Sequence, residues 1–77
     1  MRAPPVSQEA ASQIAVAHVK MRKGTEKVDV ASIEKKDSNW IVRGTCPIDL
    51  EGHAWAEKFA VSVDEKGNVR GSRFALL

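Results

Sequence analysis

The sequence has few of the residues that would cross-link it internally or anchor it in a membrane. One cysteine, Cys46, stands among 77 residues, so no internal disulfide can form. No run approaches the ~18 consecutive apolar residues of a membrane-spanning helix, and no apolar segment follows the first five residues as it would in a secretory signal. We therefore expect a cytoplasmic protein that does not bind a membrane.

Aromatic residues and net charge are also scarce. The chain has two Trp, two Phe and no Tyr, and its twelve Lys and Arg exceed its ten Asp and Glu by only two. With 43% hydrophobic and 29% charged residues, the composition is that of a folded soluble domain. A chain of this length has room for one small core and has no disulfide to support it, so we expect a homodimer.

Motifs that indicate catalysis are absent: the sequence has no phosphate-binding glycine loop, no nucleophile elbow and no HExxH. The one local cluster of reactive side chains consists of Cys46, Asp49, Glu51 and His53. Structural zinc uses paired Cys or His ligands at short spacing, calcium loops use more alternating oxygen ligands, and a thiol nucleophile needs a positioned base. Whether these four residues form a site stays open. We predict no catalytic residue, no metal, no cofactor and no small-molecule substrate.

A helix is predicted to begin at about Gln8 and to end near Gly24. Ser7 can serve as the N-cap, Glu9 lies in the first turn, and a glycine after basic residues is typical of a C-cap. Residues 1–6 form an extended lead-in and residues 7–77 a single domain. At 100° per residue one face of the helix collects the residues expected to pack inward: Ala10, Ala11, Ile14, Ala17, His18 and Met21.

From Glu26 onward the pattern has a period of two, which predicts strands. A first strand carries a bulge near Ser32, turn formers occupy residues 36–39, and a second strand begins at Trp40. Because Pro47 cannot donate to a ladder, residues 46–52 are predicted to form a loop before a third strand that ends at Val63. Residues 64–68, with Gly67, predict a hairpin to a fourth strand over residues 69–76. The predicted fold class is α+β in two layers, one N-terminal helix packed on a four-stranded antiparallel meander.

The alternation also assigns two faces to the sheet. Trp40, Trp55 and Phe59 are expected to be covered by the helix. The opposite face is predicted to be open and rich in small residues, as partner-binding surfaces often are. It should carry Ile41, Arg43, Ala54, Ala56, Lys58, Ala60, Arg70, Ser72 and Phe74. Within it we predict a partner-binding set of Arg43, Lys58, Arg70 and Phe74. An alternative is a nucleic-acid site at the basic end of the helix, made by Lys20, Arg22, Lys23 and Lys27 together with His53.

Two resemblances bear on function. Residues 52–54, 59–63 and 71–73 resemble the middle hairpin of double-stranded-RNA-binding domains, which implies that His53 enters a minor groove. The order of elements, with a Trp-led strand at residues 39–42 and a final hairpin over residues 63–69, is similar to that of small helix-plus-sheet modules of the PepSY and gas-vesicle O type. That resemblance implies a cystatin-like fold that acts by binding or regulation. We therefore predict a non-catalytic interaction module that binds a protein or itself, with RNA binding as the alternative.

Overall fold

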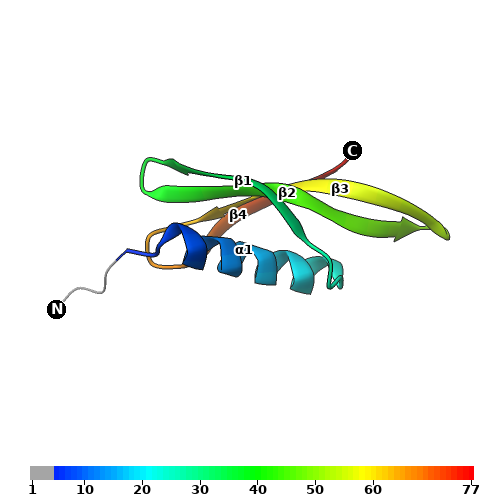
Figure 1. Ribbon diagram of the computed structural model, residues 1–77, viewed down its shortest axis with the longest axis horizontal. Coiled ribbons are helices and arrows are strands. Elements are labelled where there is room, and N and C mark those ends of the chain that lie inside the picture. Colours follow the sequence, from blue (N-terminus) through cyan, green and yellow to red (C-terminus); the bar gives the residue numbers. More distant parts are fainter. Residues whose placement is uncertain (1–4) are drawn as a thin grey trace.

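One helix and one antiparallel sheet make up the structure. The computed structural model describes residues 5–77. Helix α1 (Gln8–Lys23) is followed by strands β1 (Asp29–Lys36), β2 (Asn39–Leu50), β3 (His53–Val63) and β4 (Val69–Leu76). The strands lie in the order β1-β2-β3-β4, and α1 runs along one face of the sheet (Figure 1). The α+β arrangement predicted from the sequence is confirmed. Among residues 5–77, no helix has the length and apolar character needed to cross a membrane.

The ends of α1 lie where the sequence predicts them, but its inward face is rotated. The Ser7 hydroxyl accepts a hydrogen bond from the Ala10 N–H at 3.1 Å, and Gly24 closes the helix at φ 62°. The residues without exposed surface are Ala11, Ala15 and Val19. Their spacing of four centres the buried face on Ala15, so Ala17, about 160° away, is exposed, and Met21, about 120° away, is 78% exposed. The predicted inward placement of those two residues is wrong.

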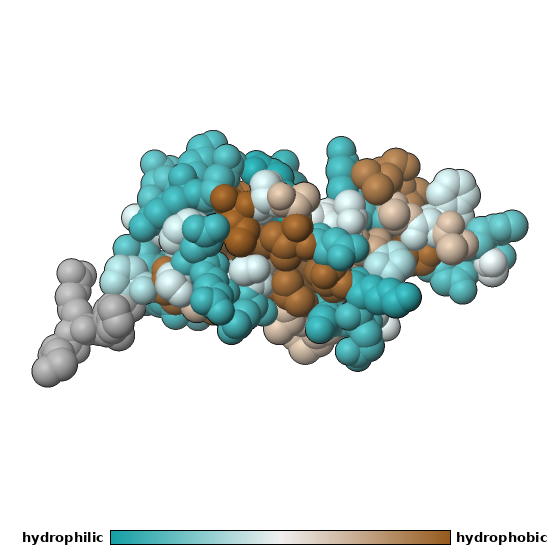
Figure 2. All heavy atoms as spheres, in the orientation of Figure 1, coloured by the Kyte–Doolittle hydropathy of each residue, from teal (hydrophilic) through white to brown (hydrophobic). Residues whose placement is uncertain are grey.

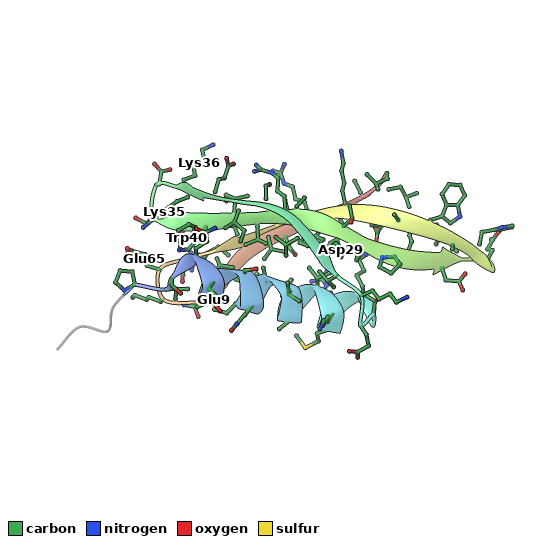
Figure 3. All side chains as sticks on the ribbon, viewed as in Figure 1. Glu9, Asp29, Lys35, Lys36, Trp40 and Glu65 are labelled. Carbon is green, nitrogen blue, oxygen red and sulfur yellow. The ribbon has the colours of Figure 1, made fainter. Side chains whose placement is uncertain are left out.

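The core lies between α1 and the middle strands. Val42, Phe59, Val61 and Val63 are at most 3% exposed. Trp40 packs against this core as predicted. In Figure 3 its side chain lies near the start of the helix.

The end of the predicted lead-in is tied to the sheet. The Trp40 Nε1–H donates to the carbonyl of Val6 at 2.9 Å, and the Val6 N–H donates to the carbonyl of Glu65 at 3.0 Å. Val6 also packs against the core. Residues 1–4 of that lead-in lie outside the described residues.

Strands β2 and β3 continue past the helix as a two-stranded hairpin, which we call the arm (residues 47–56). The predicted loop at residues 46–52 is wrong, because pairing continues to Leu50 with His53, and only Glu51 and Gly52 turn the chain at positive φ. Pro47 is tolerated because β1 pairs with β2 only as far as Thr45, which leaves the outer edge of β2 unpaired beyond it.

Trp55 lies on the arm and is 53% exposed, so the prediction that the helix covers both indoles holds only for Trp40. The helix ends beside Glu57, where Lys23 forms a salt bridge, and Trp55 lies two residues farther out along β3. Figure 2 shows hydrophobic side chains on the arm as well as in the middle of the molecule.

Candidate functional site

The face of the sheet that α1 does not cover, which we call the open face, carries long basic side chains among short ones. Strand register places Arg43 opposite Ala60, and Ala60 opposite Arg73. The two arginines therefore flank Ala60 from the neighbouring strands, with their backbones about 10 Å apart. Lys58 points to the same side two residues along β3, about 7 Å away.

The floor between these cations is shallow. Two depressions of about 520 Å³ and about 500 Å³ share Arg43, Ala60 and Arg73, so they form one continuous trough across the sheet. Lys58 lines the first depression, and Lys36 and Arg70 line the second. The side chains that form the floor are mostly short, namely Thr45, Ala60, Ser62, Gly71 and Ala75. A ligand lying on this floor would be within reach of cations on several sides.

The acidic residues of the open face lie toward its β1 edge. Glu34 accepts a hydrogen bond from Arg43 at 2.6 Å, and this contact with the guanidinium lowers the pKa of Glu34. Asp29, also on β1, pairs with Thr45. Arg70 lies 4.0 Å from Asp64 of the β3–β4 turn.

Three cations of the open face have no such partner. Lys36, Lys58 and Arg73 form no salt bridge with any residue in the 5–77 range. In Figure 3 Lys36 lies at the β1–β2 turn, on the side of the sheet away from α1. These three side chains therefore offer the trough positive charge that no salt bridge within the described part of the chain neutralises.

Of the predicted partner-binding set, Arg43, Lys58 and Arg70 line the open face, whereas Phe74 borders it but turns its ring to the other side. Its ring lies on the helix side, 4.4 Å from Lys23 Nζ and 5.9 Å from the Arg22 guanidinium carbon. Ser72 also faces the helix, because its hydroxyl lies 3.3 Å from His18 Nε2. The predicted placement of both residues on the open face is wrong.

A bulge at the start of β4 explains this error. Val63 pairs with Val69 but Ser62 pairs with Gly71, so Arg70 is an extra residue and every later side chain of β4 changes face. Arg73 thereby reaches the open face, where simple alternation had not placed it. Gly71, a glycine inside a strand pattern, is the one sequence signal of such a bulge.

The alternative nucleic-acid set is not brought together. Lys23 forms a salt bridge with the nearly buried Glu57 at 2.8 Å, and Arg22 and Lys23 both lie over Phe74, so these cations fasten the end of α1 to the sheet. His53 lies at the tip of the arm, four residues and roughly 13 Å beyond Glu57 along β3. Lys20 and Lys27 are exposed and form no salt bridge with the described residues.

The cluster of Cys46, Asp49, Glu51 and His53 is also dispersed. Cys46 is 2% exposed and belongs to the core, whereas the other three are exposed on the arm. Burial, followed by the charge of Glu57, raises the pKa of the Cys46 thiol, which favours the less nucleophilic protonated form. Within residues 5–77, no group of three or more His, Cys, Asp or Glu side chains is arranged to hold a metal ion.

Comparison with known proteins finds no matching family model, no matching curated protein and no matching solved structure. The two resemblances drawn from the sequence therefore stay predictions.

Proposed function

We propose that this chain is a small non-catalytic binding module that holds an anionic macromolecule on the open face of its sheet. The observation that carries the proposal is the placement of Arg43, Lys58 and Arg73 around one floor of short side chains. Arginine presents several N–H donors in a plane that matches a phosphate or a carboxylate, so two arginines either side of a low floor suit an anionic ligand.

Titration with heparin, a flexible polyanion, tests this proposal. We expect the backbone amide resonances around Arg43, Ala60 and Arg73 to shift at low salt and to return as salt is added, because exposed charges are screened. Amides of Ala11 and Ala15, beneath the helix, serve as the internal control. Shifts confined to the helix, or none at low salt, would remove the proposal.

A second candidate function is self-association through the arm. On the arm, Leu50 is 44% exposed and Trp55 is 53% exposed, and Leu76 of β4, which pairs with Glu57 next to the arm, is also 53% exposed. The open face is a poorer surface for self-association, since two copies stacked on it would bring like charges together. A dimer through the arm should appear as a concentration-dependent sedimentation coefficient that Trp55→Ser abolishes. Unchanged sedimentation of the wild type up to high concentration would exclude it.

A further inference from the structure

We infer that the anionic partner of the open face is a nucleic-acid duplex, held by its phosphates and without preference for base sequence. This inference rests on the proposed function and names the class of its ligand. It concerns the trough lined by Arg43, Lys58 and Arg73, and not the basic end of the helix.

The open face lacks the anchors that a protein partner needs. Protein interfaces draw most of their binding energy from a few buried aromatic or large apolar side chains. Within residues 5–77, register places one large apolar side chain on the trough, that of Ile41; Phe59 and Phe74 border the trough, but their rings lie on the helix side. Nucleic-acid binding needs no such anchor, because contacts of Lys and Arg with phosphates supply most of its affinity.

The lack of aromatic rings on the trough also favours a duplex over a single strand. Proteins that hold unpaired strands stack the bases on aromatic side chains. Phe59 and Phe74 border the first depression, but their rings pack on the helix side of the sheet, so the trough offers no ring for stacking. Trp40, Phe59 and Phe74 pack with the core, and Trp55 lies on the arm. A duplex keeps its bases stacked internally and offers phosphates at twice the density of one strand.

The spacing of the cations fits a duplex backbone. Lys58 pairs with Thr45 of β2, and Lys36 pairs with Asn39 of the same strand. These two positions of β2 are six residues apart, so the basic side chains extend over about 20 Å of strand length. A duplex segment of that length carries about twelve phosphates. The short side chains of the floor cannot reach base edges past those phosphates, so binding should not depend on sequence.

Fluorescence anisotropy with labelled RNA and DNA duplexes of about 20 base pairs tests the inference. Two unrelated sequences of each kind should bind within about threefold of one another, since the contacts are to phosphates. If Lys36, Arg43, Lys58 and Arg73 each neutralise one phosphate, the logarithm of the association constant should fall with the logarithm of salt concentration at a slope of about −3.6.

A matched pair of double variants locates the site. K58Q/R73Q removes two charges from the open face, whereas K20Q/K27Q removes two exposed charges from α1 and the segment that follows it, neither of which lines the trough. At ~0.1 M salt each phosphate contact is worth about eightfold, so the first variant should bind about sixtyfold more weakly, with a slope shallower by about two. The second should stay within about threefold of the wild type. Circular dichroism and thermal melting check that both variants are folded.

Other results of these experiments would contradict the location of the site, the class of ligand or the proposed function. If K20Q/K27Q weakens binding as much as K58Q/R73Q, the duplex does not lie on the open face. If a single strand of the same length binds more tightly than the duplex, the class of ligand is wrong. If polyglutamate or heparin shifts the open-face amides and the duplex does not, this inference fails while the proposed function stands; if none of the three does, both fail.

Discussion

At the scale of single residues, Gly44 shows how one missing side chain shapes the sheet. A Cβ at this position would overlap the carbonyl oxygen of Asp29 and would lie 2.8 Å from Phe59 Cζ. Gly44 pairs with Phe59 in the register of β2 and β3, so the absence of a side chain lets the phenylalanine ring lie over β2 beside the incoming end of β1. Glycine usually weakens a strand, but at this position the packing of the core requires a residue without a side chain.

We expect Gly44→Ala to lower the free energy of unfolding by about 2–4 kcal/mol, because the methyl group cannot fit without moving the backbone of β1. Urea denaturation measures the loss. Gly71→Ala is the matched control, since a Cβ there meets nothing within 4 Å, and it should change stability by less than about 0.5 kcal/mol. Equal losses in the two variants would show that the close contact is not the cause.

Asp64 predicts a pH dependence of stability. Its Oδ1 accepts hydrogen bonds from the N–H groups of Asn68 at 2.8 Å and Lys66 at 2.9 Å. These bonds hold the pKa of Asp64 below its ordinary 3.8, and the bond from Asn68 has the larger effect. A lowered pKa means that the charged form stabilises the fold. That stability is complete well above pH 3.8 and is lost as the pH falls through the lowered pKa.

Thermal melting between about pH 6 and about pH 2 checks this. The melting temperature of the wild type should fall more steeply with acid than that of Asp64→Asn, which keeps an acceptor oxygen and has no charge to lose. Parallel curves for the two proteins would contradict the assignment of this stability to Asp64.

At the scale of elements, short side chains fix how closely the helix approaches the sheet. Ala11 and Ala15 have no exposed surface, and Val19 completes their row. Contacts with the rest of the fold hold both ends of the helix. Before its first turn, the Val6 N–H donates to the carbonyl of Glu65, and at its last residue Lys23 forms a salt bridge with Glu57. A larger residue in the middle of that row has no room, because neither end is free to move away.

Ala15→Leu should therefore lower stability by about 1–3 kcal/mol through overpacking. Ala17→Leu is the control, because Ala17 is exposed on the outer side of the same helix and should tolerate the change within about 0.5 kcal/mol. The melting temperatures of the two variants make the comparison. A stable Ala15→Leu protein with an unstable Ala17→Leu protein would restore the inward face predicted from the sequence.

At the scale of the whole molecule, the protein has a covered half and an uncovered arm. The Cα radius of gyration is 13.2 Å, against about 11.5 Å for a compact domain of this length, and the molecule measures 51 × 19 × 17 Å. Figure 1 shows the β2–β3 hairpin extending past the end of α1. A two-stranded hairpin without a layer against it is only marginally stable, so stability should be concentrated in the covered half.

Hydrogen exchange measures that distribution. Hydrogen-bonded amides of the arm, residues 47–56, should exchange at least about tenfold faster than those of Val42 and Val61, because the arm can open without unfolding the core. Equal protection would show that the arm and the core open together. A selective rise in arm protection with protein concentration would support self-association through the arm.

Much of the local structure followed from the sequence alone. Ser7 caps the helix through its own hydroxyl, and Gly24 and Gly67 tolerate positive φ, so the ends of the helix and the last turn needed no tertiary information. The strand pattern, read with those turns, was sufficient for the α+β meander and for Arg43 and Lys58 on the open face.

Tertiary structure decided what no local pattern encodes. Whether Pro47 interrupts a strand depends on where β1 stops, and whether Trp55 is covered depends on where α1 ends relative to β3. The extra residue at Arg70 inverts the faces of β4, so that Arg73 joins the open face and Phe74 leaves it. These features depend on register between segments distant in sequence, and a shift of one residue there exchanges the inside and the outside of a strand.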